Sequence, residues 1–487
     1  MLYLIALLFP IIFGPAVSAL RLNSPRTRYL SYGAVLLITD ALASLSLVFG
    51  SGMTLFAISD RVRISFSADP LSRLTAVFVM LLYTATFFYS VEYMKKEERI
   101  PTFFSFYFVS FGAMLSVCFA DNLISLYLCF ELATLSTVPL VLHELTKEAV
   151  RAGLKYLFYS MAGALLGLLA VFFVYNYSSG DGSFVLGGFL DTRAAAGHEG
   201  VMLVMFFLGI IGFGTKAGMY PMHGWLPTAH PIAPAPGSAL LSGIIAKAGV
   251  IAVIRLVFYS IGAGFLRATW VQYAWMGLAM LTIFVGSMMA FREKHIKKRL
   301  AYSTVSQISY IMLALSLLTS DGLEGGVIHM MSHSVSKGCL FLVAGIFVTR
   351  VGRSRADQLQ GVGKAMPVTM WCFTIASLSL IGIPPLGGFL SKWIIAGAAI
   401  ESQSGLLAVL PPAILIISAL LTAGYLLPIT VDAFFPGRDF DRNTLTDADG
   451  HALTEPPVSM TAPLIVLCLV ALAVGLFGTS VTGLLGF

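Results

Sequence analysis

The sequence contains very little charge. Of its 487 residues, 57% are hydrophobic and only 11% are charged, and the mean hydropathy is +0.88. A soluble domain carries roughly 25% charged residues. A water-soluble fold could not cover this much apolar surface, so the composition predicts an all-α integral membrane protein whose helices are surrounded by lipid.

Cysteine is also scarce, and no two cysteines form a CxxC pair. All five lie in apolar stretches, which is typical of small buried hydrophobic residues and argues against iron–sulfur clusters, zinc sites and disulfide frameworks. The sequence has no nucleotide-binding loop and no haem ligand pair either. We therefore expect no cofactor and no metal, and we do not expect the chain itself to be a redox catalyst, although it could be a subunit of an oxidoreductase. The cysteines are Cys118, Cys129, Cys339, Cys372 and Cys468.

Apolar runs long enough to cross a bilayer are abundant. A spanning helix needs about 20 apolar residues, and the first twenty residues, which lack a basic start and a cleavage site, predict a membrane helix and not a signal peptide. The stretch 54–66 alternates like a strand or hairpin and is expected outside the bilayer. Fourteen spans are predicted, near 2–20, 31–49, 70–91, 101–120, 122–143, 152–176, 201–223, 237–258, 269–291, 299–319, 323–349, 366–396, 406–434 and 458–485.

The basic residues between these spans alternate strongly. The odd-numbered loops contain 19 Lys and Arg and the even-numbered loops contain 4. The positive-inside rule then predicts that the odd loops are cytoplasmic and that both termini are extracytoplasmic. The odd loops hold Arg21, Arg26, Arg28, Lys95, Lys96, Arg99, Lys147, Arg151, Arg292, Lys294, Lys297, Lys298, Arg299, Arg350, Arg353, Arg355, Lys364, Arg438 and Arg442, and the even loops hold Arg61, Arg63, Arg193 and Arg267.

Seven further basic residues fall inside predicted spans. Arg73, Lys155 and Arg255 are near span ends, where snorkelling to the interface is expected. A charge at the centre of the bilayer costs at least about 2.5–3.5 kcal/mol, so the deeper ones must pair, face internal water or lose their charge. Inert ion pairs between helices are the alternative interpretation. The deep ionisable residues are Glu131, Lys216, Lys247, His329, His333, Lys337 and Lys392.

Glu131 and Lys216 are predicted to pair. Glu131 is the only glutamate deep in a predicted span, with apolar neighbours on both sides. Lys216 precedes Pro221, which interrupts the seventh span, and non-helical backbone at membrane depth is tolerated only inside the protein or beside internal water. His230 follows in a Pro-rich stretch, where a proton-relay role and a capped loop histidine are both open.

Two later spans carry candidate relay residues. Lys247 lies mid-span among small residues, and a lysine removed from bulk water near other cations can exchange its proton near neutral pH. His329, His333 and Lys337 are spaced i, i+4, i+8, which places them on one helix face about 6 Å apart along the axis. This spacing is that of a proton relay. A metal site is the alternative, but the lysine and the lack of a nearby carboxylate argue against it.

A second Pro/Gly interruption, at 382–388, precedes Lys392 in the twelfth span. Interruptions in spans 7 and 12 predict two inverted five-helix repeats, spans 4–8 and 9–13, with ion sites at their interface. Span 10 carries the polar Ser306 and Gln307 where span 5 carries Glu131. The chain is expected to be a single transmembrane domain, 1–487, divided into 1–100 (peripheral helices), 101–258 (first repeat), 269–435 (second repeat) and 458–485 (last helix).

Three motifs in this region resemble those of antiporter-like membrane subunits: TKAGMYPMHGWLPTAH at 215–230, HMMSHSVSKG at 329–338 and GIPPLGGFLSKW at 382–393. That family comprises the D-type subunits of Mrp cation/proton antiporters, the L, M and N subunits of respiratory complex I, and subunits of energy-converting membrane hydrogenases. The resemblance covers nearly the whole chain. It implies fourteen helices, two inverted repeats and a proton path through the ionisable residues above. Lys392, and the absence of a lateral helix after the last span, make the chain more similar to the D-type and hydrogenase subunits.

The function predicted is proton translocation, with Na⁺ as a possible counter-ion, by one subunit of a multisubunit complex in a prokaryotic cell (inner) membrane. Protons are expected to enter by one repeat, reach Lys247, and pass through Lys337 and Lys392. The alternative is a subunit of a redox-driven pump. A polytopic membrane transferase is disfavoured because the ionisable residues are central and the loops short, and a solute carrier acting alone is disfavoured by the resemblance. Other membrane subunits, protons, Na⁺ and lipid are the expected partners, with no nucleic acid. The identity of the complex, the exchanged cation, the direction and stoichiometry of transport, and the energy source are open.

Overall fold

The structure, a computed structural model, describes residues 1–20, 22, 24–59, 62–178, 180–437, 440, 445–484 and 486. Twelve helices in this described part are long and apolar enough to cross a membrane, which agrees with the predicted multi-pass all-α class. The expected spans 299–319 and 366–396 correspond to α13, which begins with three basic residues, and to the shorter α16 and α17. Outside the described residues lie four of the basic loop residues, Arg21, Arg61, Arg438 and Arg442.

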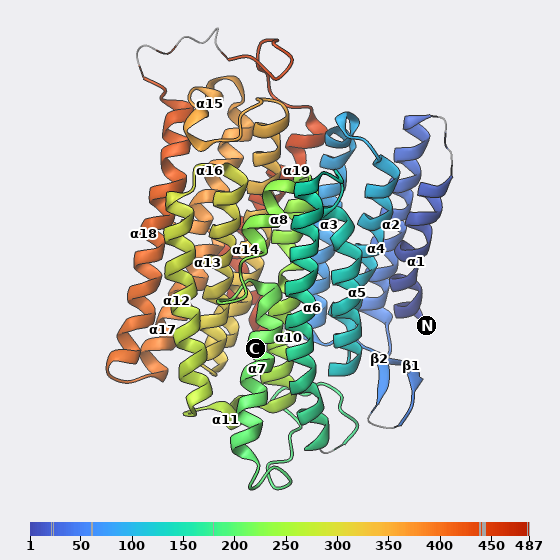
Figure 1. The fold of residues 1–487 in the computed structure, drawn as a ribbon, viewed down its shortest axis with the longest axis vertical. Helices are drawn as coiled ribbons and strands as arrows, with labels where there is room; N and C mark the ends of the chain where they lie inside the picture. Colours follow the sequence, from blue (N-terminus) through green and yellow to red (C-terminus); the bar gives the residue numbers. More distant parts are fainter. Residues whose placement is uncertain are drawn as a thin grey trace. The chain divides into compact units, whose positions relative to one another are not determined.

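The main helices form in chain order, with a single hairpin after the second (Figure 1). They are α1 Leu2–Ala19, α2 Pro25–Phe49, β1 Met53–Ala57, β2 Arg63–Phe66, α3 Pro70–Tyr93, α4 Ile100–Phe119, α5 Leu123–Val141, α6 Lys147–Asn176, α7 Glu199–Ala217, α8 Leu226–Ile232, α9 Ala235–Leu240, α10 Lys247–Leu256, α11 Ala263–Leu266, α12 Trp270–Arg292, α13 Ile296–Ser316, α14 Ser320–Thr349, α15 Val362–Ala365, α16 Pro367–Ile381, α17 Gly387–Ser402, α18 Leu406–Phe434 and α19 Val458–Leu484. The antiparallel β1–β2 pairing confirms the predicted hairpin.

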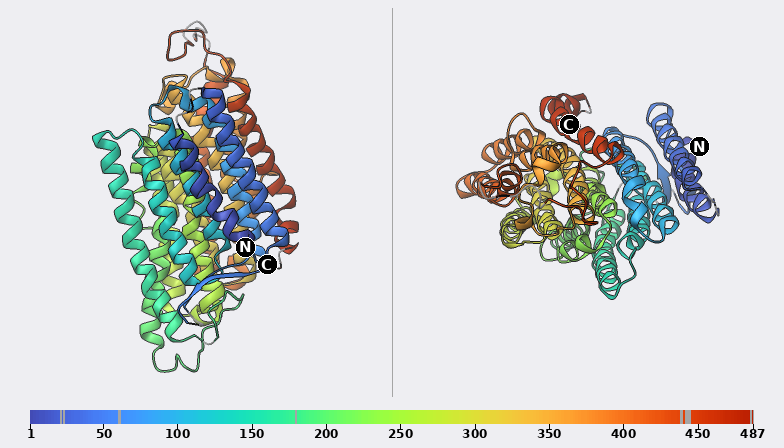
Figure 2. Two further views of the ribbon diagram at one scale, coloured as in Figure 1. Left: turned by 90° about the vertical axis from the view of Figure 1, so that its right-hand side faces the viewer. Right: turned by 90° about the horizontal axis from the view of Figure 1, so that it is seen from above.

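The chain divides into two compact units, and unit 1 comprises residues 1–83, 98–225 and 244–277. In it α1 and α2 run beside α4, as the blue helices of Figure 2 show. Small residues let these helices approach closely, as is usual between membrane helices. A Cβ added to Gly163 of α6 would lie 2.6 Å from the carbonyl oxygen of Gly212 of α7, and one added to Gly212 would lie 2.5 Å from that of Gly163.

The even-numbered loops of unit 1 meet at one end of its helices, here called the hairpin end. Arg63 of β2 forms an ion pair of 2.7 Å with Asp181 and lies 3.9 Å from Asp121. The backbone N–H of Val185 donates to the carbonyl of Tyr259 at 3.2 Å. Loops 2, 4, 6 and 8 therefore share one end, as the alternation of basic residues predicts.

Unit 2 comprises residues 84–97, 226–243 and 278–487. Its central element is α14, which packs against α9, α13, α16, α17 and α19. A helix that is enclosed on all sides has no polar face, and 94% of the best membrane window of α14 is buried. The predicted His–His–Lys series thus lies on the most enclosed helix of this unit.

The odd-numbered loops of unit 2 also meet at one end, here called the basic end. Lys96 forms an ion pair of 2.6 Å with Asp449, and the N–H of Ile296 donates to the carbonyl of Ser354 at 2.8 Å. The short α15 packs on α16 and α18 at this end (Figure 1). Which end faces the cytoplasm stays a prediction.

Both predicted interruptions are present. Helix α7 ends at Ala217, where Gly218 is left-handed (φ 83°), and α16 ends at Ile381, where Gly382 is left-handed (φ 96°). Glycine adopts this conformation without a steric penalty. The sequence did not indicate a third irregularity, the π-helical turns at Leu241–Ile245 and Val257–Ile261 on either side of α10. Such turns within helices often occur at functional sites.

Candidate functional site

In unit 1, Lys216 lies in the last turn of α7 and is fully buried. Its Nζ donates to the carbonyl of Phe130 at 2.9 Å and to Oγ1 of Thr134 at 2.7 Å, and it lies 4.1 Å from the centre of the Phe130 ring. Phe130 precedes Glu131 on α5 and Thr134 is one turn further on. The ammonium group therefore lies beside the helical turn that carries Glu131.

Glu131 itself is half-buried. Its Oε1 is inaccessible to solvent and makes no hydrogen bond. The same helix exposes Leu128 and Leu135 by 47% and 55%, so Glu131 lies between the interior of unit 1 and an apolar outer face of α5. The proximity of the two residues supports the predicted pairing of Glu131 with Lys216, which stays a prediction.

Lys247 is the first residue of α10 and is fully buried. Two residues on, Gly249 packs directly on α7: an added Cβ would lie 2.6 Å from the carbonyl oxygen of Phe213 and 3.2 Å from Cβ of Lys216. The start of α10 therefore lies against the end of α7. Unit 1 thus brings Lys216 and Lys247 together on adjoining helices, next to the turn that carries Glu131.

The prediction that Arg255 snorkels to the interface is wrong. Arg255 is only 2% exposed, and its guanidinium donates two hydrogen bonds to the carboxylate of Asp69, at 2.5 and 2.7 Å. The rings of Phe184 and Tyr259 lie 4.8 and 4.5 Å from it. Because Asp69 directly precedes α3, an ion pair is available, and this pair fixes the last turn of α10. Arg73 is exposed and Lys155 half-buried.

In unit 2, the residues His329, His333 and Lys337 all lie on α14 and are all buried. The rings of the two histidines are stacked, with centroids 6.2 Å apart. One turn further on, Nζ of Lys337 donates to the carbonyl of Leu300 on α13 at 3.0 Å. The predicted one-face arrangement is present, and its last member is oriented toward α13.

Lys392 of α17 joins the other end of this series. It is half-buried, and its Nζ donates to the last carbonyls of α16, those of Leu380 at 2.5 Å and Ile381 at 2.8 Å. It also lies 5.1 Å from the centre of the Tyr310 ring on α13. The Tyr310 ring in turn lies 5.3 Å from that of His329. Tyr310 thus connects Lys392 to the histidines.

His230, near the end of α8, is fully buried and stacks on Phe341 of α14, with ring centroids 4.5 Å apart. Phe341 is one turn beyond Lys337. The structure therefore places His230 on a short helix in the core of unit 2, and its relay role stays a prediction.

Three residues of this arrangement were missed by the sequence reasoning. Ser391 accepts or donates a hydrogen bond at 2.8 Å with Nδ1 of His329. Tyr310 was hidden in a helix that is polar throughout. Lys297, counted above as a loop residue, is only 4% exposed, and its Nζ donates to the carbonyl of Ala233 at 3.0 Å. The position of Ser391 beside Lys392 was the one signal in the sequence that could have indicated it.

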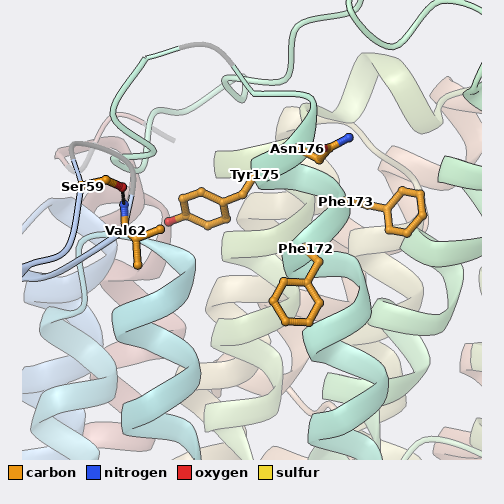
Figure 3. A pocket seen from close by; sticks show the side chains of 6 residues that line it. All are labelled: Ser59, Val62, Phe172, Phe173, Tyr175 and Asn176. Carbon is orange, nitrogen blue, oxygen red and sulfur yellow. Dashed lines mark hydrogen bonds between the residues drawn. The ribbon is translucent and has the colours of Figure 1, made fainter.

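One cavity of unit 1 lies apart from all these residues (Figure 3). It has a volume of about 520 Å³ and is lined by the hairpin tip and the end of α6. Its wall is mostly apolar and contains none of the predicted site residues. The described residues contain no group of three or more His, Cys, Asp or Glu side chains that could hold a metal. The cavity lining is Ser59, Val62, Phe172, Phe173, Tyr175 and Asn176.

Fold and site together define a multi-pass helical membrane protein with titratable residues inside each of two units. Residues 120–420 match the family model described as "NADH:quinone oxidoreductase/Mrp antiporter, TM", and residues 56–104 match that of the N-terminus of complex I chain 5. The first match covers more than half of the chain. The chain therefore belongs to the NADH:quinone oxidoreductase/Mrp antiporter membrane family.

Curated relatives come from several kinds of complex. NADH-quinone oxidoreductase subunit N of Desulforudis audaxviator is 30% identical, with 85% of this chain and 82% of the relative covered. The D-type subunit of the Na(+)/H(+) antiporter of Alkalihalophilus pseudofirmus is 26% identical, with 76% and 73% covered. Hydrogenase-4 component B of Escherichia coli is 32% identical over 67% of this chain, which spans about half (49%) of that relative. A chain in the structure of the Mrp complex from Dietzia sp. has the same fold, with a TM-score of 0.83 and 23% identity over 100% of this chain and 96% of that one.

Proposed function

We propose that this chain is a proton-translocating, antiporter-like subunit of a multisubunit complex in a prokaryotic cell membrane. The observation that carries the proposal is that each unit encloses its own titratable series. Unit 1 holds Lys216 and Lys247 on adjoining helices, and unit 2 holds the histidines and lysines of α14 and α17. Placing a charge at membrane depth is costly, so such a set persists where it serves ion transport.

The proposed roles follow from the contacts. Lys216 exchanges a proton when Glu131 moves toward or away from it, because a nearby carboxylate favours the charged ammonium. Lys247, on the adjoining helix, responds to the charge on Lys216. In unit 2 the histidines accept and donate protons between Lys337 and Lys392. Movement of one proton across 100 mV requires about 2.3 kcal/mol, so a partner subunit or an ion gradient supplies the energy.

The test is proton transport in inverted vesicles that contain the chain with its partner subunits. We expect Lys216→Ala and Glu131→Ala each to reduce transport at least tenfold. The matched control is Lys147→Ala, since Lys147 is an exposed lysine at the start of α6. Native-level transport in both Lys216→Ala and Glu131→Ala would remove the pair from the mechanism.

A second candidate is a subunit of a redox-driven pump. It is favoured by the greater identity and coverage of the quinone oxidoreductase relative than of the Na(+)/H(+) antiporter relative. Transport driven by a Na⁺ gradient alone supports the Mrp-type function, whereas transport that requires an electron donor supports the redox-driven one.

The orientation proposed is that both termini are extracytoplasmic and the basic end is cytoplasmic. Alkaline phosphatase is active only outside the cytoplasm, so a fusion after residue 486 is expected to be active and a fusion within the loop at 350–364 inactive. The reverse pattern would contradict the orientation.

A further inference from the structure

Four polar residues of α13 lie on one face of this helix and are all buried: Ser303, Ser306, Gln307 and Tyr310. Their spacing of i, i+3, i+4 and i+7 places them one above the other over two turns. They belong to unit 2, and the site described above uses only Tyr310.

Hydroxyl groups from three helices meet at the centre of this face. Oγ of Ser287 on α12 lies 2.7 Å from that of Ser306 and 2.5 Å from that of Ser418 on α18, and the Ser306 and Ser418 hydroxyls are 3.2 Å apart. Isolated hydroxyls in membrane helices usually bond to a carbonyl of their own helix, as Ser309 does with Val305 at 2.9 Å. These three are instead directed at one another.

Toward the basic end, the polar contacts continue without interruption. The hydroxyl of Tyr425 on α18 donates to Ser303 at 2.7 Å, and Thr422 lies 3.3 Å from the same hydroxyl. Nη1 of Arg299 donates to the carbonyl of Tyr425 at 2.9 Å. Nε of Arg299 donates to the carbonyl of Glu293, a half-buried residue of the basic end, at 2.7 Å.

Toward the other end, the series reaches the titratable residues. The hydroxyl of Tyr310 makes no hydrogen bond of regular geometry, although the Ser418 hydroxyl lies next to it. The opposite side of the Tyr310 ring system contacts Lys392 and His329. From Tyr310 to Arg299 the helix rises about 16 Å, roughly half of the 30 Å thickness of the hydrocarbon core.

Gln307 is the observation that points to a ligand. It is fully buried, and neither its Oε1 nor its Nε2 has a hydrogen-bond partner in the protein. An unsatisfied buried amide costs about 1–3 kcal/mol, and buried polar groups of this kind are normally satisfied by internal water. A purely structural core position would be filled by an apolar residue.

We propose that these residues form a water-filled proton branch between Lys392 and the basic end of unit 2, here called the α13 branch. Water molecules bound by Gln307 and the serine hydroxyls carry protons between Lys392 and Glu293. The inference rests on the proposed function and adds a route that leaves Lys392 along α13, α12 and α18. The branch consists of Ser287, Ser303, Ser306, Gln307, Tyr310, Ser418, Thr422 and Tyr425.

The first test uses proton transport in vesicles containing the whole complex. Gln307→Leu and the double variant Ser306→Ala, Ser418→Ala are expected to reduce transport at least fivefold. The control Ser309→Ala, on the same helix, removes a hydroxyl bonded within the helix and is expected to leave transport unchanged. If Lys216→Ala abolishes transport and Gln307→Leu does not, the α13 branch is refuted while the proposed function stands. If neither variant changes transport, the proposed function fails as well.

The second test measures hydration without relying on activity. Ser303→Cys and Ser306→Cys are expected to react with a small hydrophilic methanethiosulfonate applied at the basic end, at rates at least tenfold above those of Ser309→Cys and of the native buried cysteines. Equal, slow labelling of all three positions would show that the face is dry and overturn the proposal, even where a variant lowers transport by impairing folding.

Discussion

The ion pair between Arg255 and Asp69 predicts unequal costs for its two halves. Asp69→Asn leaves a guanidinium that is 2% exposed without its carboxylate. Removing one partner of a buried ion pair costs about 3–5 kcal/mol, so we expect a loss near the lower end of this range. Arg255→Met leaves a carboxylate that is 28% exposed and still accepts a hydrogen bond from the N–H of Ser72. Its expected cost is about 1–2 kcal/mol.

The double variant separates the ion pair from its surroundings. Replacing both residues removes both charges, so the coupling energy from the cycle is expected to be about 2 kcal/mol. The assay is the free energy of unfolding in mixed micelles, followed by tryptophan fluorescence. Arg73→Met is the control, since Arg73 is exposed and lies only one turn into α3. The reasoning is refuted if Asp69→Asn is no less stable than Arg255→Met.

The same pair predicts a pH dependence. Burial by itself would raise the pKa of Asp69, but the hydrogen bonds and charge of Arg255 and the bonds from Ser72 outweigh it, so the pKa lies below the usual value. A lowered folded-state pKa stabilises the fold above the unfolded-state value of about 3.9, and this stabilisation disappears as the pH falls through the folded-state pKa. The stability difference between the wild type and Arg255→Met is therefore expected to be constant from pH 7 to 5 and to shrink below about pH 4.

Further predictions concern helix approach and the α14 series. Gly249→Ala is expected to destabilise unit 1 by about 1–3 kcal/mol, because the new Cβ would meet the carbonyl of Phe213 at 2.6 Å; Gly277→Ala, which meets nothing within 4 Å, is the control, and equal unfolding free energies would contradict the close packing. Gly388→Ala should impair folding, since its Cβ would lie 1.7 Å from the carbonyl oxygen of Ser379; normal yield and melting temperature in detergent would argue against the α16–α17 geometry. Lys337→Gln is expected to lower proton transport at least tenfold with little change in melting temperature, and native transport would exclude Lys337 from the relay.

Local patterns were sufficient for the positions of most helices and for both interruptions. Runs of apolar residues predict spans because lipid permits only backbones that satisfy their own hydrogen bonds. The Gly–Pro groups at 218–221 and 382–385 predict breaks because proline removes a donor and glycine accepts a left-handed conformation. The π-helical turns around α10 were not predictable, since they depend on how α10 packs and not on a residue type.

The side-chain partners were much less predictable. The spacing of His329, His333 and Lys337 is a property of one helix, so it is readable in the sequence. That Lys216 donates to Phe130 and Thr134, and that Lys392 faces Tyr310, requires knowledge of which helices adjoin. Such pairs are separated by tens of residues or more.

By itself, the sequence determined that the chain spans a membrane, where its helices run, how its loops alternate and which charges are buried, because each of these depends on the cost of placing polar groups in lipid. Only the tertiary structure decided what those charges contact. Arg255 has an ion-pair partner 186 residues away, and the α13 branch joins hydroxyls from three helices. Contacts of this kind depend on the packing of helices against one another, which no local run of residues encodes.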